Sequence, residues 1–305
     1  MSLGELRLQA STAIGDILYS IQSRIPEYTY DLAPGETAHT LFGIRDIEPA
    51  RLHRKGQVAY AAIVSQVAEQ NLSEASGLAL SQSMRALSSM AAAGAHTFIP
   101  QTYARLVREV DRCIEPRKLD TMGTLGVLED ILALKHLGAA DLSQTAERLF
   151  AGLRTEDENS PYMILGLIQT YSLYGKSMPE SLTSRYHALD LSESSDSLEA
   201  EVVKRLEEEG LLSDGRSSVF YNGFEFDIAS KLDRINIELD GRHHTTGFYR
   251  IRDELRDRFI ESFRWRVLRV KVRYGMSADD ILDRVRAALI ASRATDTIGD
   301  ISSTG

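Results

Sequence analysis

Cysteine and long apolar runs are nearly absent from this sequence. Cys113 is the single cysteine among 305 residues, which excludes an internal disulfide framework and any metal cluster built from cysteines. No apolar run reaches the roughly 20 residues of a membrane-spanning helix. Residues 1–18 also lack the continuous apolar core of a secretory signal. We therefore expect no membrane partner and a cytoplasmic location.

An excess of basic residues is missing too. The chain has 35 Lys and Arg against 44 Asp and Glu, a net charge of −9, so the protein is not coated in basic surface. The charge is uneven, however. Residues 216–273 contain 13 basic and 9 acidic residues, a balance of +4, which leaves 22 against 35, or −13, elsewhere. A polyanionic partner would therefore meet the C-terminal third of the chain.

Residues 1 to about 190 carry the pattern of successive helices. Apolar residues recur at three- and four-residue spacing, for example in QVAYAAIVSQVAEQ and LGVLEDILALKHLG. Three such segments end at a glycine of the kind that closes helices, namely Gly94, Gly138 and Gly175. This part of the chain is predicted to be an all-α domain.

Aligned on these glycines, the three helical segments resemble one another. The positions four, seven and ten residues before each glycine are apolar: Met90, Leu87 and Met84; Leu134, Ile131 and Leu128; Tyr171, Ile168 and Leu165. The glycines are 44 and 37 residues apart, a spacing typical of helical-pair repeats. Such repeats stack into a solenoid with a concave face. A generic bundle whose glycines are only helix caps is the alternative.

The pattern changes after a polar, serine-rich break at residues 190–197, which we take as the domain boundary. Residues 196–292 predict the order α-β-β-β-α-β-α, with an Asn-Gly hairpin turn at 222–223. Residues 293–305 are expected to form a disordered tail. The expected fold class is therefore α+β, with an all-α domain over 1–190 and an α/β domain over 196–292.

Three carboxylates are expected to meet in the α/β domain. Asp227 lies on one predicted strand, and the next strand, joined to it by the turn SKLDR, carries Glu238 and Asp240 on one face, so the strand ends can converge. Like charges at short range raise one another's pKa unless a cation neutralises them. Oxygen ligands suit a hard divalent ion. These residues therefore predict a site for Mg²⁺ or Mn²⁺, an ion that assists phosphodiester hydrolysis.

This frame resembles the core of PD-(D/E)xK nucleases. Within that superfamily, residues 195–290 are most similar to the RAP domain of organellar RNA-processing proteins, through Asp227 and the Glu-x-Asp-Gly-x-x-His motif that begins at Glu238. Very-short-patch repair endonucleases resemble it nearly as well. The resemblance implies a restriction-endonuclease-like fold for the second domain. It also implies that the degenerate helical repeats bind RNA, while the RAP module cuts RNA or serves as a platform.

The resemblance leaves one catalytic position open. A PD-(D/E)xK nuclease has lysine two residues after the glutamate, where this chain has Asp240. His244, Lys231 or Arg242 could replace that lysine, and His244 matches the histidine of the RAP pattern. An imidazole there could act as a general acid or base near neutral pH. The predicted catalytic residues are thus Asp227, Glu238, Asp240 and His244.

Basic residues around this motif are the predicted contacts to nucleic acid. The segment RIRDELRDRFIESF is a charged helix whose arginines either form ion pairs at its surface or contact phosphates. The predicted nucleic-acid-binding residues are Lys231, Arg242, Arg250, Arg256 and Arg266.

Three functions remain open from the sequence. The first is an RNA-binding protein with a metal-dependent endoribonuclease site; the second is a DNA endonuclease built on the same core. The third is a non-catalytic helical scaffold that binds protein partners. The resemblance also keeps an organelle, or delivery by a bacterium into a host cell, as alternative locations.

Overall fold

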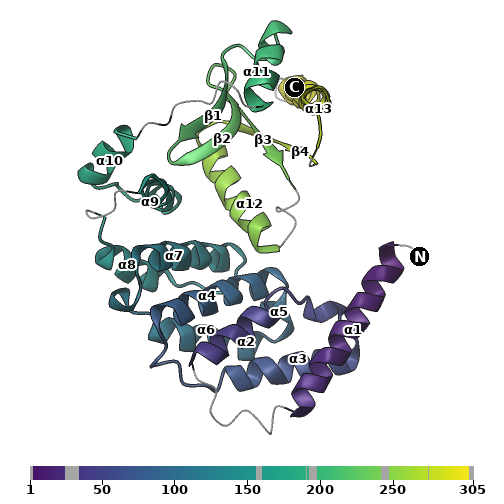
Figure 1. Cartoon of the computed structure of the whole chain (residues 1–305), viewed down its shortest axis with the longest axis vertical. Helices are drawn as coiled ribbons and strands as arrows, with labels where there is room; N and C mark the ends of the chain where they lie inside the picture. The colour runs from purple at the N-terminus through teal and green to yellow at the C-terminus, as the bar shows by residue number, and fades with distance from the viewer. Residues whose placement is uncertain are drawn as a thin grey trace. The chain divides into compact units, whose positions relative to one another are not determined.

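The chain folds into two compact units. A computed structural model describes residues 3–24, 34–155, 160–189, 191, 198–241, 247–273 and 275–301. One unit comprises Met1–Arg154 and Thr246–Arg252, and the other comprises Thr155–Thr245 and Asp253–Gly305. Helices dominate the N-terminal part, and a four-stranded mixed sheet lies toward the C-terminus (Figure 1). The broad α+β layout predicted from the sequence is confirmed.

The first unit is built from helices. Within its described residues these are α1 (Leu3–Arg24), α2 (Pro34–Ile44), η2 (Pro49–Arg51), α3 (Arg54–Val67), α4 (Gly77–Ala92), α5 (Ala95–Phe98), α6 (Pro100–Cys113), η3 (Pro116–Lys118), α7 (Thr121–His136) and α8 (Ser143–Gly152). Helix α4 packs between α2 and α7, and α1 packs on α3. No described helix of the chain is long and apolar enough to cross a membrane.

The glycines used to align the helical segments do end helices. Gly94, Gly138 and Gly175 all have positive φ, at 88°, 64° and 60°. After Gly138, the Ala139 N–H donates back to the Leu134 carbonyl at 2.9 Å, the bond that closes a left-handed helix cap. Of the aligned apolar residues all except Leu165 are buried. The spacing thus identified equivalent helix ends correctly.

A buried acid lies inside the helical unit. Asp130 of α7 is fully buried, and its Oδ1 accepts from Arg85 Nε and Ser88 Oγ of α4, both at 2.7 Å. Burial raises the pKa of Asp130 to about 7, although the positive charge of Arg85 opposes that shift. This polar group therefore ties α7 to α4 within an otherwise apolar core.

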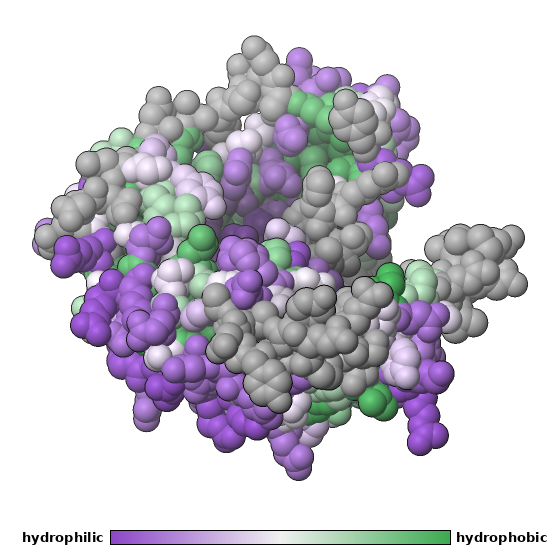
Figure 2. All heavy atoms as spheres, turned by 60° about the horizontal axis from the view of Figure 1, so that its bottom comes forward, coloured by the Kyte–Doolittle hydropathy of each residue, from purple (hydrophilic) through white to green (hydrophobic). Residues whose placement is uncertain are grey.

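The described residues on the face drawn in Figure 2 are mainly hydrophilic. Hydrophobic residues lie among them in separate groups. Single large apolar side chains such as Leu78 and Val58 are exposed, at 70% and 59%. Scattered exposure of this kind is typical of a globular protein surface.

The second unit contains the sheet and the helices that flank it. Its described elements are α9 (Pro161–Leu173), α10 (Glu180–His187), α11 (Leu198–Glu208), β1 (Gly215–Tyr221), β2 (Phe224–Ser230), β3 (Ile235–Asp240), α12 (Gly247–Ser262), β4 (Arg266–Lys271) and α13 (Ala278–Ile301). The first turns of α12 group with the other unit. The predicted order α-β-β-β-α-β-α is present from α11 to α13.

Two boundaries differ from those expected. The compact units divide after Arg154, so α9 and α10 group with the sheet, whereas the sequence places the boundary at 190–197. The hairpin tip packs against α9, which accounts for that grouping. Helix α13 runs to Ile301 and includes much of the segment 293–305 expected to be a tail. Residues 192–197 and 302–305 lie outside the described residues.

The sheet has the order β1-β2-β3-β4. Strands β1, β2 and β3 pair antiparallel, and β4 pairs parallel to β3, from Ile235 opposite Arg266 to Asp240 opposite Lys271. A parallel neighbour requires a crossover connection, and α12 supplies it. The result places the last residues of β3 beside those of β4.

Helices cover both faces of this sheet. On one face α11 and α13 pack on Ile228, Ile235 and Ile237. On the other face Ile260 of α12 packs with aromatic residues of β2 and with Trp265 (Figure 1). Side chains alternate along β3, so Asn236, Glu238 and Asp240 project toward the α12 face. The sheet therefore sends the acidic residues to the face that α12 covers.

The predicted Asn-Gly hairpin is confirmed. Asn222 and Gly223 join β1 to β2 and have φ values of 50° and 80°, as a two-residue hairpin turn requires. Gln169 of α9 donates from Nε2 to the Gly223 carbonyl at 2.6 Å. A Cβ at Gly223 would lie 2.9 Å from the Leu165 carbonyl oxygen. Close helix packing and positive φ both favour glycine here.

Candidate functional site

The acidic residues gather where β2 and β3 stop pairing. The β2–β3 ladder runs from Ser230 and Ile235 to Ile228 and Ile237 and is seen no further, while β3 stays paired with β4 up to Asp240. Asp227 and Glu238 come directly after that last β2–β3 pair, and Asp240 lies two residues further along β3. Backbone groups that lose a ladder partner must find another one, and they do so through side chains.

Asp227 takes over the role of a backbone acceptor. Its Oδ2 accepts the Leu239 N–H at 2.7 Å, so a carboxylate extends the β2–β3 contact after the ladder ends. On the same strand the Glu225 carbonyl accepts from Arg256 Nη2 of α12. Burial raises the pKa of Asp227, and the hydrogen bond from Leu239 lowers it in part. The end of the ladder is thus held by one acid and one arginine.

Glu238 is the most buried acid of the site. Its side chain is 7% exposed, and Oε1 accepts from Asn236 Nδ2 at 2.8 Å and from Arg256 Nη2. Burial raises the pKa of Glu238 to about 7; Arg256 opposes this shift, and the negative charge of Asp227 adds to it. A carboxyl group with such a pKa can exchange a proton near neutral pH, as a general acid or base must.

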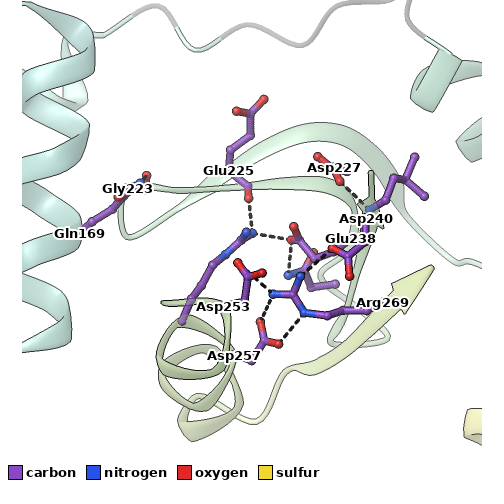
Figure 3. A network of polar contacts seen from close by, with 12 residues as sticks. Gln169, Gly223, Glu225, Asp227, Glu238, Asp240, Asp253, Asp257 and Arg269 are labelled. Carbon is purple, nitrogen blue, oxygen red and sulfur yellow. Dashed lines mark hydrogen bonds and ion pairs between the residues drawn. The ribbon is translucent and has the colours of Figure 1, made fainter. Parts of the chain in front are cut away.

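Asp240 is paired with an arginine from the neighbouring strand. Arg269 of β4 donates from Nη1 to Asp240 Oδ1 at 2.7 Å. Arg269 also donates two hydrogen bonds to the Asp257 carboxylate of α12, from Nε at 2.7 Å and from Nη2 at 2.8 Å (Figure 3). Its Nη2 lies 3.7 Å from Asp253 Oδ1. Burial opposes the charge of Arg269, but Asp257, Asp253 and Asp240 together raise its pKa above the usual value. The ion pairs of Arg269 therefore join α12 to the sheet.

The site carries more acid than base. Five carboxylates, those of Asp227, Glu238, Asp240, Asp253 and Asp257, surround the two guanidinium groups of Arg256 and Arg269. If every group is ionised the sum is −3. Such an excess favours either a bound cation or proton uptake by one acid, and the raised pKa of Glu238 represents the second response.

The predicted metal ligands do not surround one point. Their oxygens suit Mg²⁺ or Mn²⁺, but Asp227 contacts a backbone N–H, while Glu238 and Asp240 pair with different arginines. Across the described ranges no three His, Cys, Asp or Glu side chains are placed to hold a metal ion. As they stand, these side chains do not form a metal site, so metal binding stays a prediction.

The predicted basic residues are divided over the unit. Arg256 lies in the site, whereas Lys231 follows β2 and Arg266 begins β4, at the opposite end of the sheet. Arg250 is exposed in the first turn of α12. Arg242 and His244 lie outside the described residues. The structure therefore separates residues that the sequence placed in one group.

Sequence analysis missed four members of the network: Asn236, Asp253, Asp257 and Arg269. Asp253 and Asp257 are four residues apart, a spacing that puts both on one helix face. Arg269 and Glu238 are direct neighbours in the β3–β4 register, but that register is not visible from either strand alone. The sequence pattern therefore indicates the acidic residues, but it does not indicate the pairing that joins them to Arg269.

The fold and the site define a three-layer α/β/α unit with a partly buried carboxylate–arginine network at the end of its β2–β3 ladder. Comparison with known proteins adds no relative: no protein-family model matches the chain, and neither does any curated protein. The class of protein therefore has to be argued from the site itself.

Proposed function

We propose that the protein binds RNA and that its C-terminal unit is a PD-(D/E)xK-like, RAP-like module able to cleave it. The helical segments before this unit would be degenerate repeats that contribute to RNA binding. The observation that carries the proposal is Glu238, a buried acid with a near-neutral pKa beside Asp227 and Arg256. The element order from α11 to β4 supports it, because the acids lie on the two strands where the resemblance expects them.

The chemistry assigned to this chain is proton transfer and charge stabilisation. Glu238, when deprotonated, would accept the proton of an attacking water as its oxygen bonds to phosphorus, and the leaving ribose oxygen would take a proton from solvent. Arg256 would stabilise negative charge on the phosphate, the role that the missing lysine would otherwise have. Its side chain is 19% exposed, and its guanidinium already pairs with Glu238. No step is assigned to a metal ion.

The test compares Glu238→Gln with the parent protein on single-stranded RNA. We expect the variant to lose cleavage while it keeps RNA affinity, because glutamine fills the same space but cannot accept the proton. Glu208→Gln is the control, since Glu208 is exposed on α11 and pairs only with Lys204 among the described residues. Cleavage by Glu238→Gln at the parent rate would overturn the catalytic assignment.

Two further arms of this assay settle the remaining predictions. Assays on duplex and single-stranded DNA beside RNA would separate the endoribonuclease from the DNA endonuclease. Assays with Mg²⁺, with Mn²⁺ and with a chelator would test the predicted metal requirement. Cleavage that persists in the chelator would remove the metal from the proposal and leave Glu238 in place.

A non-catalytic module is the second candidate, and one observation favours it. Glu238 and Asp240 are already paired with Arg256 and Arg269, which is how acids that hold a helix on a sheet would look. In that case RNA binding should persist and weaken with added salt, with no cleavage under any metal condition. Absence of RNA binding even at low salt would favour the protein-binding scaffold.

A further inference from the structure

Two arginines occupy backbone positions that normally favour glycine. Among the described residues that are not glycine, φ is positive only at Ser218, Asn222, Arg234 and Arg264. Asparagine tolerates this conformation, but arginine does not favour it. Arg234 and Arg264 have φ values of 54° and 64°. Backbone conformations of this kind persist where the surrounding structure holds them, and they cluster at functional sites. The two arginines are therefore candidates for a functional role.

The two arginines come from different turns that meet at one end of the sheet. Arg234 ends the turn between β2 and β3, and Arg264 follows α12. The Arg234 carbonyl accepts the Arg266 N–H at 2.8 Å, and Arg234 Nη1 donates to the Phe263 carbonyl at 3.0 Å. Arg234 and Arg264 are both exposed, as is Lys231 in the same turn. Three cationic side chains therefore point into solvent from adjoining turns.

The acids of these turns are engaged elsewhere. Asp233 accepts from the Ser213 N–H and from Ser230 Oγ, at 2.9 and 2.8 Å. Asp214 accepts from Ser230 Oγ and the Leu232 N–H, at 2.7 and 3.0 Å. These hydrogen bonds shape the turns and occupy both carboxylates. No ion pair is seen for Lys231 and Arg264 in the described part of the chain, so they remain open to an external anion.

An aromatic residue adjoins the cationic ones, since Phe263 precedes Arg264 and its carbonyl accepts from Arg234. Phe263 is 40% exposed, and its ring packs against Phe259 and Tyr221, with centroids 5.0 and 5.8 Å apart. Both contacts are T-shaped, with 67° and 74° between the ring planes, and part of the residue stays open to solvent. A supported aromatic ring flanked by cations is the arrangement that holds single strands, because bases stack on the ring and phosphates meet the cations.

We propose that Lys231, Arg234, Phe263 and Arg264 form a strand-binding edge for single-stranded nucleic acid. This edge lies at the start of β3, whereas Asp240 ends β3 five residues later, roughly 17 Å away at the usual rise per residue. A strand bound there would be held at one end of the sheet while the acidic site lies at the other. The inference rests on the proposed function and adds where the nucleic acid is held.

The test uses the full chain and the double variant Arg234→Gly/Arg264→Gly. Glycine suits positive φ, which offsets the lost hydrogen bond from Arg234 to the Phe263 carbonyl, so the melting temperature should change little while affinity for a short oligouridylate falls. Removing two phosphate contacts should make the log–log salt dependence shallower by about 1.4. Lys204→Ala/Arg284→Ala is the matched control, because these exposed residues lie on α11 and α13, outside this edge and the acidic site, and the same charge is removed. The control should bind as the parent does.

The outcomes separate this inference from the proposed function. If Arg234→Gly/Arg264→Gly binds and cleaves at the parent level, the strand-binding edge is wrong, while the proposed function stands. Failure of the parent to bind RNA or DNA at low salt overturns both proposals. Should the glycine variant be poorly folded, Lys231→Glu tests the same edge without a backbone change, and it must weaken binding. An oligothymidylate of equal length shows whether the edge takes DNA as well as RNA.

Discussion

Glu238 links the stability of the second unit to pH. Its pKa is about 7 in the folded chain and near 4.5 in an unfolded one, so folding favours the protonated acid. The stabilising contribution is complete below about pH 4.5 and is lost as the pH rises through about 7. A shift of this size corresponds to about 3 kcal/mol.

Glu238→Gln should therefore change the pH dependence of stability. Glutamine cannot ionise, so the free energy of unfolding of the variant should gain about 3 kcal/mol relative to the parent between about pH 5 and about pH 8.5. Denaturant titrations at both pH values measure this gain. Loss of the Arg256 partner shifts both values together and does not alter the difference. An equal offset at the two pH values would contradict the raised pKa.

Asp130 should behave in the same way in the helical unit. Burial raises its pKa from 3.8 to about 7, so its contribution is present below about pH 4 and lost toward pH 7. Asp130→Asn should gain about 3 kcal/mol over the parent between about pH 5 and about pH 8.5, measured by denaturant titration. Asp141→Asn is the control, because Asp141 is exposed and its pKa is lowered by Ser143. That control should show no gain at neutral pH.

At the scale of elements, Arg269 is the main link from α12 to β4. Arg269→Lys removes the two-pronged contact with Asp257, which an ammonium group cannot reproduce. The variant leaves partly buried acids poorly paired, so the free energy of unfolding should fall by about 2 kcal/mol. Chemical denaturation measures the loss. Arg273→Lys, just beyond β4, should change stability by less than about 0.5 kcal/mol, and an equal effect of both changes would deny the link.

The hairpin tip is the second link between elements. Gly223→Ala would place a Cβ 2.9 Å from the Leu165 carbonyl oxygen of α9 and would strain a positive φ. We expect a loss of about 2 kcal/mol in unfolding free energy, seen as a lower melting temperature. Asn222→Gly suits the same turn without meeting α9 and should preserve stability. A stable Gly223→Ala variant would show that the tip does not pack closely on α9.

For the whole molecule, the two buried acids should act independently. Glu238 and Asp130 belong to different compact units and share no partner, so their effects should add. Asp130→Asn/Glu238→Gln should gain roughly 5 kcal/mol in summed unfolding free energy over the parent between about pH 5 and about pH 8.5. Calorimetry at several pH values checks this. A gain equal to that of one single variant would show that the two acids are coupled.

The sequence predicted the elements of this fold well because they follow from local chemistry. Spacing of apolar residues marked the helices, glycine marked their ends, and Asn222 with Gly223 marked the hairpin. Asp227, Glu238 and Asp240 are predicted from their positions on two neighbouring strands. Their partners were not, because Arg256 and Arg269 reach them only through the docking of α12 and the parallel register of β4.

What the sequence alone determined is the order of the elements and the face on which each acidic residue lies, since both depend on neighbours within a few residues. Only the tertiary structure decided that an arginine neutralises each of two acids and that α9 belongs with the sheet. It also decided that turns some thirty residues apart in sequence unite Arg234 with Arg264. These are contacts between distant segments, whose geometry is fixed when the helices pack on the sheet.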